Sequence, residues 1–323
     1  MRSLVSVVIV TYNSSPFIVE TLESVSKQTW KEIELIITDD CSGDDTVEVC
    51  RRWLKINEQR FASVDIITSE KNTGVPANAN RGLHSARGDW MSFLAGDDTL
   101  KSKCVEDNMV WIDSHPEIRV LFSCIQVFNN TFEPQNLIAT TPGDPYQPRG
   151  IMAHGRSAES QYKMLLLSDR IHFTPSLFLH RETLLEIGGF DERFKLLEDH
   201  PLWLNLTKNG HKLYFMNKVT VNYRRHSKSI YNTGTDYLIN PNYFKREDFR
   251  KVYIYPNLPV DIRLNARFYW YASQVFKYDW LNNTKKINRF MLALLTIYLN
   301  PFKYFIWLKK FFYKNLKDNE FYT

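Results

Sequence analysis

Two adjacent carboxylates that follow a short apolar segment are the residues of this sequence best placed to do chemistry. The run from Trp90 to Leu94 is apolar, and shortly after it come Asp97 and Asp98. Such a run is typical of a buried strand, and ligands of parallel sheets collect at the carboxyl ends of the strands. Neighbouring carboxylates repel each other unless a cation or hydrogen-bond donors compensate them, so the pair predicts a divalent-cation site. The alternative is a polar turn that caps a helix.

A second acidic segment follows another predicted strand. The apolar run from Ile33 to Thr38 ends in Asp39 and Asp40, so two acidic strand ends are expected in one sheet. Proteins that bind dinucleotides carry instead a G-x-G-x-x-G motif after their first strand. Residues 11–14 occupy that place here with the sequence T-Y-N-S, so dinucleotide binding is disfavoured.

The chain from residue 4 to about residue 126 alternates short apolar runs with segments of helical periodicity, which predicts an α/β domain with a largely parallel sheet. Residues 129–157 contain several Pro and Gly without clear periodicity, and they predict a long irregular connection. The predicted strands are 4–11, 33–38, 64–68, 90–94, 119–126, 174–180 and 212–226. The predicted helices lie near 16–25, 47–54, 75–86, 100–114, 158–167, 184–185 and 197–209.

The composition is that of an ordinary globular protein: of 323 residues, 44% are apolar and 24% are charged. The first apolar run breaks at residues 11–13, which is too short for a signal peptide, so we expect it to be the first strand of a chain with a cytosolic start. The four cysteines contain no C-x-x-C pair, and neither a zinc site nor a disulfide framework is indicated.

The carboxyl-terminal region differs in character from the rest of the chain. Residues 285–317 contain eight Lys or Arg and no acid, with aromatic residues between them. The longest uncharged run there is 290–302, whose 13 residues include Pro301; a bilayer span needs ~20 apolar residues. The pattern predicts an amphipathic segment that lies on an anionic membrane surface. The alternative is a helix that packs on its own domain and exposes a solvated basic face.

Several short motifs, taken in order, resemble those of family 2 glycosyltransferases. The amino-terminal half of that family is similar to residues 6–13, 39–46, 72–75, 79–80 and 96–98, and its acceptor half to 188–192 and 197–199. The resemblance covers about residues 4–230. It implies the GT-A fold, an α/β architecture with a Rossmann-like mixed sheet flanked by helices, here with a mainly helical extension after it. It also implies inverting transfer of a sugar.

The resemblance further implies a site for the nucleotide part of the donor. Thr11, Tyr12 and Asn13 would lie against the nucleotide, with the Tyr12 ring stacked on the base. Asp40 would accept a hydrogen bond from the uracil imide, and Asp97 would lie near the ribose. The alternative for Asp40 is an acidic loop that caps the next helix.

Asp98 and His226 are the metal ligands that the resemblance implies, for a Mn²⁺ or Mg²⁺ ion that bridges the two phosphates. Many family members carry an acid where this sequence has Ala95, so one contact to the ribose or the metal is missing. A lone His is more often a structural hydrogen-bonding residue, and this alternative stays open for His226. Arg224 and Arg225 either reach phosphates or pair with acids.

Asp199 is the general base that the resemblance implies, since inverting transfer needs a carboxylate to take the proton of the acceptor hydroxyl. An acid near a helix start is also favoured by the helix dipole, which is the structural alternative. His172, Thr174 and Ser176 either line the acceptor pocket or form the polar face of a strand. No Q-x-x-R-W motif of processive synthases follows, so addition of a single sugar is predicted.

These features predict a metal-dependent glycosyltransferase of cell-surface polysaccharide synthesis that moves one sugar, from a UDP-sugar donor, to a glycan or lipid-linked acceptor. We expect residues 1–127 to bind the nucleotide sugar, 128–235 to bind the acceptor and 236–323 to form the basic, aromatic helical region. The protein is expected to be cytoplasmic, peripheral on the inner face of the cell membrane and without a nucleic acid partner. Two alternatives remain: a non-catalytic nucleotide- or glycan-binding protein on the same fold, and a sugar nucleotidyltransferase.

Overall fold

The computed structural model describes residues 3–142, 150–153, 155–227, 237–313 and 321 of the chain. The chain folds as two compact units. Unit 1 comprises residues 1–162 and 170–226, and unit 2 comprises residues 163–169 and 227–323. The sheet of unit 1 runs through both of the predicted halves, 1–127 and 128–235. The strand Trp90–Ala95 pairs with Phe178–His180, and Val120–Asn129 pairs with Leu213–Arg225.

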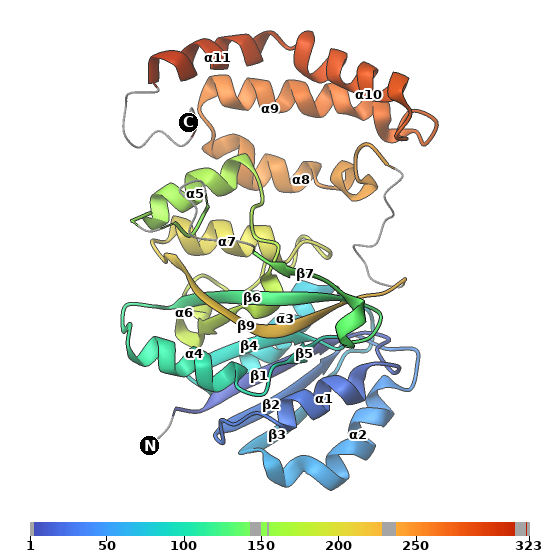
Figure 1. Cartoon of the computed structure of the whole chain (residues 1–323), viewed down its shortest axis with the longest axis vertical. Coiled ribbons are helices and arrows are strands. Elements are labelled where there is room, and N and C mark those ends of the chain that lie inside the picture. Colours follow the sequence, from blue (N-terminus) through green and yellow to red (C-terminus); the bar gives the residue numbers. More distant parts are fainter. Residues whose placement is uncertain (1–2, 143–149, 154, 228–236, 314–320, 322–323) are drawn as a thin grey trace. The chain divides into compact units, whose positions relative to one another are not determined.

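Unit 1 is built on one mixed open sheet, in which the described residues form nine strands (Figure 1). The strand order is β3-β2-β1-β4-β8-β6-β9-β5, and β7 pairs with β6 outside this path. Strands β3, β2, β1 and β4 run parallel, whereas β8 is antiparallel to both of its neighbours. The strands are β1 Val5–Thr11, β2 Ile33–Asp39, β3 Ser63–Thr68, β4 Trp90–Ala95, β5 Thr99–Leu100, β6 Val120–Asn129, β7 Leu137–Thr141, β8 Phe178–His180 and β9 Leu213–Arg225.

The register of the parallel strands brings the two acidic segments to one edge of the sheet. Every residue of β2 is buried, as expected for a strand covered on both faces. Thr11 at the end of β1 pairs with Asp39 of β2, and Val10 pairs with Ala95 of β4. The three strands therefore end level, and the residues that follow them meet at the same carboxyl edge.

The helices of unit 1 differ in burial: α1 and α2 each bury one face, whereas most residues of α7 are buried. Helix α3 packs so closely on β1 and β2 that a Cβ atom at Gly82 would lie 2.3 Å from a Val8 methyl group. The helices from the amino terminus to α7 are α1 Ile18–Ser26, α2 Thr46–Asn57, α3 Val75–Ser85, α4 Cys104–Asp113, α5 Ala158–Leu167, α6 Arg181–Glu186 and α7 Asp199–Lys208. These helices confirm the predicted alternation of strands and helices through residue 126.

Two sequence-based predictions of secondary structure need correction. The segment predicted as one strand, 174–180, begins instead with a 3₁₀ turn at Thr174–Ser176, and only β8 is extended; Pro175 lacks the N–H group that a strand ladder needs. The connection predicted to be irregular, 129–157, contains β7, which pairs antiparallel with β6. Most of the β7 side chains are exposed, so no apolar alternation marks the strand in the sequence. Residues 143–149 and 154 of this connection lie outside the described residues.

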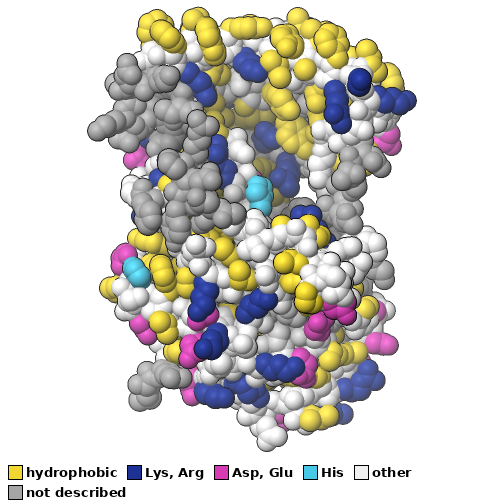
Figure 2. Space-filling view, in the orientation of Figure 1, with side chains coloured by type: hydrophobic (Ala, Val, Ile, Leu, Met, Phe, Trp, Pro, Cys, Tyr) yellow, Lys and Arg dark blue, Asp and Glu magenta, His cyan; other side chains and the backbone are white. Residues whose placement is uncertain are grey.

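Unit 2 is helical in its described part. It contains α8 Glu247–Phe249, α9 Val260–Ser273, α10 Lys286–Ala293 and α11 Pro301–Tyr313, and a core cluster of Ile239, Phe276 and Leu281. No single described helix is long and apolar enough to cross a membrane. The segments Lys286–Tyr298 and Pro301–Phe312 meet that criterion only as a pair, which is bent by 61°. Figure 2 shows apolar side chains gathered over the outer surface of α10 and α11.

Candidate functional site

The end of β2 carries an acid whose hydrogen-bonding capacity is used by the protein itself. Asp40 is 3% exposed, and its carboxylate accepts hydrogen bonds from the backbone N–H groups of Thr73 and Gly74 at 2.9 and 2.7 Å. The Thr73 hydroxyl and the Arg81 guanidinium donate two more, both at 2.6 Å. Burial alone would raise the pKa of Asp40, but these donors outweigh burial and hold its pKa below the ordinary value. Asp40 therefore anchors the turn at residues 73–74.

The loop that precedes α7 packs against this turn. Gly74 has a φ of 97°, and a Cβ atom there would lie 2.8 Å from the Lys195 carbonyl oxygen, so only glycine fits. The Val75 N–H group donates to the same Lys195 oxygen at 3.2 Å. Asn80 of α3 donates to the Phe190 carbonyl and accepts from the Phe190 N–H group, both at 2.9 Å. The motifs at residues 72–80 and 188–192 are thus brought together by direct contacts.

The three residues predicted to contact the nucleotide lie at the same edge in different surroundings. Tyr12 is 50% exposed, which leaves its ring open to stacking. Thr11 is buried, and its hydroxyl has no hydrogen-bond partner among the described residues. Asn13 accepts a hydrogen bond from the Gly43 N–H group at 2.8 Å and donates its own N–H to Ser42 at 2.7 Å. Asn13 therefore joins the loops after β1 and β2, with its side-chain oxygen already engaged.

The end of β4 carries an acid that the protein satisfies only in part. Asp98 is completely buried, and its Oδ1 accepts a hydrogen bond from the Arg224 N–H group at 2.8 Å. Its Oδ2 is buried without a hydrogen-bond partner among the described residues. Burial, with the negative charge of Asp97 beside it, raises the pKa of Asp98 well above the ordinary value. A carboxyl group in this setting needs either a bound proton or a neighbouring cation.

Asp97 and His226 lie in direct contact at the same strand end. The distance between Asp97 Oδ2 and His226 Nε2 is 2.9 Å. The His226 ring also packs on Phe17, which precedes α1, with 4.6 Å between ring centroids. A carboxylate oxygen and an imidazole nitrogen are both suitable ligands for Mn²⁺.

The donor set at this strand end fits a divalent cation held partly by its substrate. Within the described ranges, no group of three or more His, Cys, Asp or Glu side chains could hold a metal ion. Asp97 and His226 would therefore supply two ligands, and diphosphate or water oxygens would supply the others. The unsatisfied Asp98 oxygen is a third acceptor near them. The residues present fit a metal–diphosphate complex better than a metal bound by protein alone.

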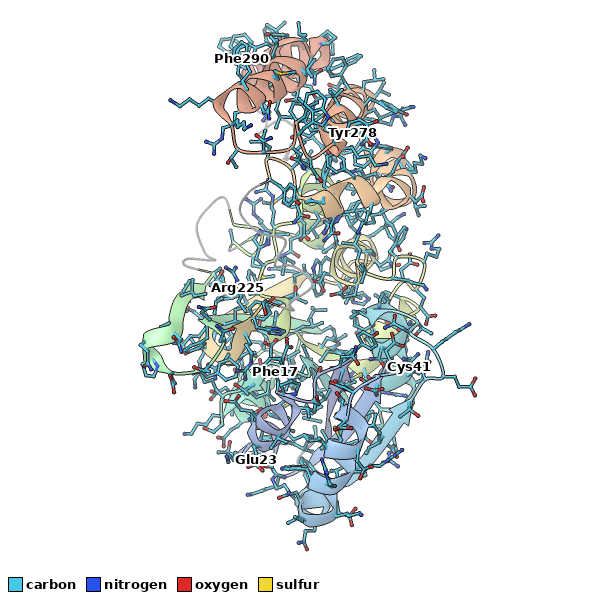
Figure 3. The ribbon with its side chains drawn as sticks, turned by 90° about the vertical axis from the view of Figure 1, so that its right-hand side faces the viewer. Phe17, Glu23, Cys41, Arg225, Tyr278 and Phe290 are labelled. Carbon is cyan, nitrogen blue, oxygen red and sulfur yellow. The ribbon has the colours of Figure 1, made fainter. Side chains whose placement is uncertain are left out.

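Arg224 ties the acidic strand end to two other segments. It is 3% exposed, and its Nε donates a hydrogen bond to the Asp97 carbonyl oxygen at 2.8 Å. Its terminal nitrogens donate to the Asn130 carbonyl and, at 2.5 Å, to the Glu20 carboxylate of α1. The neighbouring Arg225 is exposed at the end of β9 (Figure 3). Arg224 therefore positions the strand end and does not offer its charge to solvent.

Asp199, the predicted general base, is the first residue of α7 and is half-buried. Its Oδ2 accepts a hydrogen bond from the Thr174 hydroxyl at 2.9 Å. The negative charges of Asp199 and of the acids after β4 all act on Tyr223 of β9. Burial, together with the charges of Asp98, Asp97 and Asp199, raises the pKa of Tyr223 to about 12. One tyrosine is thus close enough to feel all three acids.

The other predicted acceptor residues have separate surroundings. The Ser176 hydroxyl donates to the Ser123 carbonyl at 2.8 Å and accepts from the Ser123 N–H group at 3.0 Å, so it joins the 3₁₀ turn to β6. His172 is exposed. Of the three polar residues predicted near the acceptor, Thr174 is the one whose contact with Asp199 is established.

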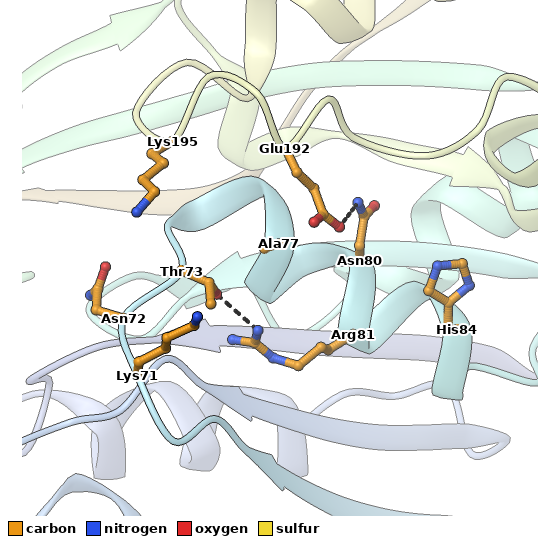
Figure 4. A pocket seen from close by; sticks show the side chains of 9 residues that line it. All are labelled: Lys71, Asn72, Thr73, Ala77, Asn80, Arg81, His84, Glu192 and Lys195. Atoms are coloured by element: carbon orange, nitrogen blue, oxygen red, sulfur yellow. Dashed lines mark hydrogen bonds between the residues drawn. The ribbon is translucent and has the colours of Figure 1, made fainter.

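A cavity of about 490 Å³ lies beside α3 (Figure 4). Its lining includes Lys71, Arg81, Glu192 and Lys195, and none of the acids at the end of β4. Arg81 points toward Thr73 and Glu192 toward Asn80, so the side chains that line the cavity also hold the two motif loops together (Figure 4). The acidic strand end lies outside this cavity.

An open α/β sheet with acids at level strand ends, continued by an antiparallel β8 and the long strands β6 and β9, is the arrangement of GT-A nucleotide-sugar enzymes. The family model described as glycosyl transferase family 2 matches residues 6–175, and the chain belongs to this family. It is a transferase by family, as the motifs predicted.

Relatives and solved structures agree with this membership. An uncharacterized glycosyltransferase of Haemophilus influenzae is 27% identical over 311 residues, which are 91% of this chain and 95% of the relative. WfaP of Escherichia coli, named as a UDP-Glc:alpha-D-GlcNAc-diphosphoundecaprenol beta-1,3-glucosyltransferase, is 29% identical over 227 residues, 70% of this chain and 79% of WfaP. Staphylococcus aureus TarS residues 1–349, crystallised with UDP-GlcNAc, superimposes with a TM-score of 0.59 at 17% identity, covering 99% of this chain and 89% of TarS. That likeness shows the fold.

The sequence analysis left two roles open for Arg224 of β9, and its ion pair with Glu20 shows that it pairs with an acid. Arg224 is buried and the neighbouring Arg225 is exposed, as side chains of successive strand residues point to opposite faces. This alternation was the sequence pattern that could have indicated a buried arginine. Tyr223 precedes Arg224 in β9, and the sequence motifs did not indicate that the charge of Asp199 acts on this tyrosine. Contacts of this kind join segments far apart in the chain, so spacing alone does not reveal them.

Proposed function

We propose that this protein transfers one sugar from a nucleotide sugar, in the first instance a UDP-sugar, to a hydroxyl of a glycan or lipid-linked acceptor, with inversion. The observation that carries the proposal is the end of β4, where Asp97 lies 2.9 Å from His226 and Asp98 keeps a buried oxygen without a hydrogen-bond partner among the described residues. A leaving diphosphate needs a cation and an attacking hydroxyl needs a base. This edge of the sheet offers acids suited to both tasks.

On the donor side, Tyr12 stacks on the base, Thr11 and Asn13 line the nucleotide, and Asp97 with His226 holds a divalent cation, Mn²⁺ or Mg²⁺. The short Asp97–His226 contact favours Asp97 as a metal ligand beside its predicted place near the ribose. When bound, such a cation neutralises the charge that grows on the leaving diphosphate.

Two of the predicted donor-site acids have surroundings that refine their roles. Asp98 stays a predicted ligand through its unsatisfied Oδ2. Asp40 already accepts four short hydrogen bonds. We therefore assign it the role of holding the loop that shapes the base pocket. A hydrogen bond from uracil would go to a carboxylate oxygen that already accepts one.

On the acceptor side, Asp199 takes the proton of the acceptor hydroxyl. The hydroxyl oxygen then forms a bond to the anomeric carbon while the bond from that carbon to the diphosphate oxygen breaks. The hydrogen bond from the Thr174 hydroxyl orients the Asp199 carboxylate toward this task. Attack from the face opposite the diphosphate inverts the anomeric configuration.

The substrate class rests on the relatives. WfaP is named for a diphosphoundecaprenol acceptor, and TarS is named as a poly(ribitol-phosphate) beta-N-acetylglucosaminyltransferase. By analogy, we place this protein in cell-surface polysaccharide synthesis, on the cytoplasmic face of the cell membrane, where a lipid-linked acceptor would be presented. Residues 1–127 would bind the donor and 128–235 the acceptor.

The test is thermal unfolding with UDP, GDP, CMP or dTDP, each with and without Mn²⁺. A ligand at one hundred times its Kd stabilises the folded state by about 2.7 kcal/mol, so the matching nucleotide should stand out and should require the metal. An Asp199→Asn variant should keep this response and lose transfer. Absence of any metal-dependent response would refute the donor site. A wild-type protein that binds UDP but transfers no sugar to lipid-linked acceptors would favour a non-catalytic binding protein.

A further inference from the structure

The α10–α11 segment of unit 2 buries polar side chains and exposes apolar ones. Asn288, Thr296 and Asn300 are 5%, 4% and 1% exposed. Phe290 and Trp307, in contrast, are 59% and 65% exposed, and Phe311 and Phe312 are 70% and 74% exposed. Figure 2 shows this apolar surface along the outer side of the two helices. Water imposes the opposite pattern on a surface helix, whose apolar stripe faces the core.

Polar contacts within unit 2 hold the helices in this orientation. The Asn300 side chain donates to Asn265 Oδ1 of α9 at 2.8 Å, and Asn288 donates to the Trp280 carbonyl at 3.2 Å. Lys309 forms an ion pair with Asp261 of α9 at 2.8 Å. Buried polar groups are costly unless they are hydrogen-bonded. The helices therefore cannot roll to bury their apolar side without losing these bonds, and the outward apolar side is a fixed feature of the unit.

Cations border the apolar side chains. Lys285, Lys286, Arg289 and Lys303 are exposed, and no acid occurs between residues 285 and 317. Lys314 and Lys317 lie outside the described residues. Aromatic side chains combined with unopposed cations match the interface of a bilayer with acidic headgroups. A second copy of the chain would bring the same cations against these, so like charges oppose self-association through this surface.

We infer that this surface, the outer side of α10–α11 with its bordering cations, docks unit 2 onto an anionic membrane. The helices lie in the plane of the interface. Helix α11 has 13 residues; at 1.5 Å per residue it is about 20 Å long, less than the ~30 Å hydrocarbon core. The 61° bend between the two segments lets both follow a surface. The inference does not depend on sugar transfer, since vesicle binding is measured without a donor or acceptor.

Flotation of the full-length protein with phosphatidylcholine vesicles, with and without phosphatidylglycerol, tests the inference. The protein should float with the anionic vesicles. It should remain in the bottom fraction when only neutral vesicles are present. A Phe311→Ser/Phe312→Ser double variant should weaken binding about tenfold for each lost side chain. A Lys286→Gln/Arg289→Gln double variant should weaken it about fivefold for each lost charge. High salt should release the wild-type protein.

A matched control comes from unit 1, where Ile56 is 75% exposed beside the exposed Lys55 on α2. A Lys55→Gln/Ile56→Ser variant should bind vesicles like the wild type, and unchanged thermal unfolding of all variants shows that they fold. Equal binding by the control and both α10–α11 variants would overturn the inference. So would an oligomer that the Phe311→Ser/Phe312→Ser change dissociates without affecting flotation, because a second copy would then cover the surface. Resistance to both high salt and alkaline extraction would replace surface docking by insertion.

Trp307 provides an independent readout inside the surface. Its fluorescence should shift to the blue and become protected from iodide when anionic vesicles are added, because the ring leaves water. A Trp307→Phe variant keeps an aromatic side chain and should still float, so the difference between its spectrum and the wild-type spectrum isolates this residue from the other seven tryptophans. A wild-type spectrum that vesicles leave unchanged, while flotation succeeds, would show that another surface binds and would overturn the assignment.

Discussion

The acidic ends of β2 and β4 flank β1 and look alike in sequence, yet their carboxylates differ in the hydrogen bonds that they receive. Asp40 receives four short hydrogen bonds from Thr73, Gly74 and Arg81. Asp98 receives one from a backbone N–H group and keeps an unpaired buried oxygen, while Asp97 beside it contacts His226. Both ends are buried and acidic, so burial does not separate them. The two ends differ in the number of hydrogen-bond donors that the fold supplies to each carboxylate.

This difference assigns the two ends different tasks. A carboxylate with fixed internal donors keeps its charge without help, and it stabilises the loop that provides them. A carboxylate with too few donors is costly in the empty protein and gains most when a cation arrives. The comparison therefore predicts that the acid at the end of β2 contributes to stability, whereas the acids at the end of β4 contribute to ligand binding and turnover.

Replacing Asp97 with Asn should produce the largest effect, on activity. The change removes the charge of the metal ligand that we propose at the leaving diphosphate, and we expect kcat/KM to fall about a thousandfold, equivalent to ~4 kcal/mol. The free energy of unfolding should change by less than about 1 kcal/mol, because a partly exposed ion pair contributes little. Steady-state transfer assays and urea unfolding measure both quantities. Asp45→Asn, at an exposed position before α2, is the control and should leave both unchanged. Full transfer by Asp97→Asn would remove the distinction between the two strand ends.

The second prediction concerns the buried cation that holds the end of β4. An Arg224→Met variant leaves the Asp97 and Asn130 carbonyl oxygens without their donor and Glu20 without its partner. We expect a loss of about 3 kcal/mol in the free energy of unfolding, since each unsatisfied buried group costs about 1–3 kcal/mol. Arg225→Met changes the exposed neighbour and should stay within about 0.5 kcal/mol of the wild type. Equal stability of the two variants would show that Arg224 does not position the site.

Much of the fold was predictable, because the parallel strands are short apolar runs that end in turn or acidic residues. The strands β1, β2, β3 and β4 were predicted to within a residue or two, and the family motifs supplied the GT-A class. The strand β7 escaped prediction because it pairs at the edge of the sheet with most of its side chains in solvent. Strand β8 was predicted to begin too early, because residues 174–176, which include Pro175, form a 3₁₀ turn and not an extended strand.

The site was less predictable than the fold. The candidate acids could be chosen from strand ends, since position along the chain decides which residues follow a strand. Their partners could not, because the donors of Asp40 come from α3 and its preceding turn, and the side chain that contacts Asp97 is His226, which follows β9 more than a hundred residues away. The distinction between a saturated acid and an unsatisfied one depends on these distant partners. It therefore becomes visible only in the folded protein.

A smaller effect is expected at the end of β2, where Asp40→Asn places an amide NH₂ group among hydrogen-bond donors. We expect a loss of about 2 kcal/mol at neutral pH, the cost of leaving buried donors unmatched. The loss should depend on pH. Because the pKa of Asp40 is lowered in the folded protein, its stabilisation is present above the unfolded pKa of about 3.9 and disappears as the pH falls through the folded value. Urea unfolding from pH 7 down to acid should show the wild type approaching the variant below about pH 4.

A companion change decides whether the donors or the burial of Asp40 cause this pH dependence. Thr73→Val removes the hydroxyl that donates at 2.6 Å but keeps the two backbone donors and Arg81. The variant should lose about 1 kcal/mol, with a weaker pH dependence than the wild type, because fewer donors then favour the charged carboxylate. A pH profile of Thr73→Val that matches the wild type would mean that the hydroxyl does not lower the pKa. The contrast with Asp98 would then rest on Arg81 and the backbone donors alone.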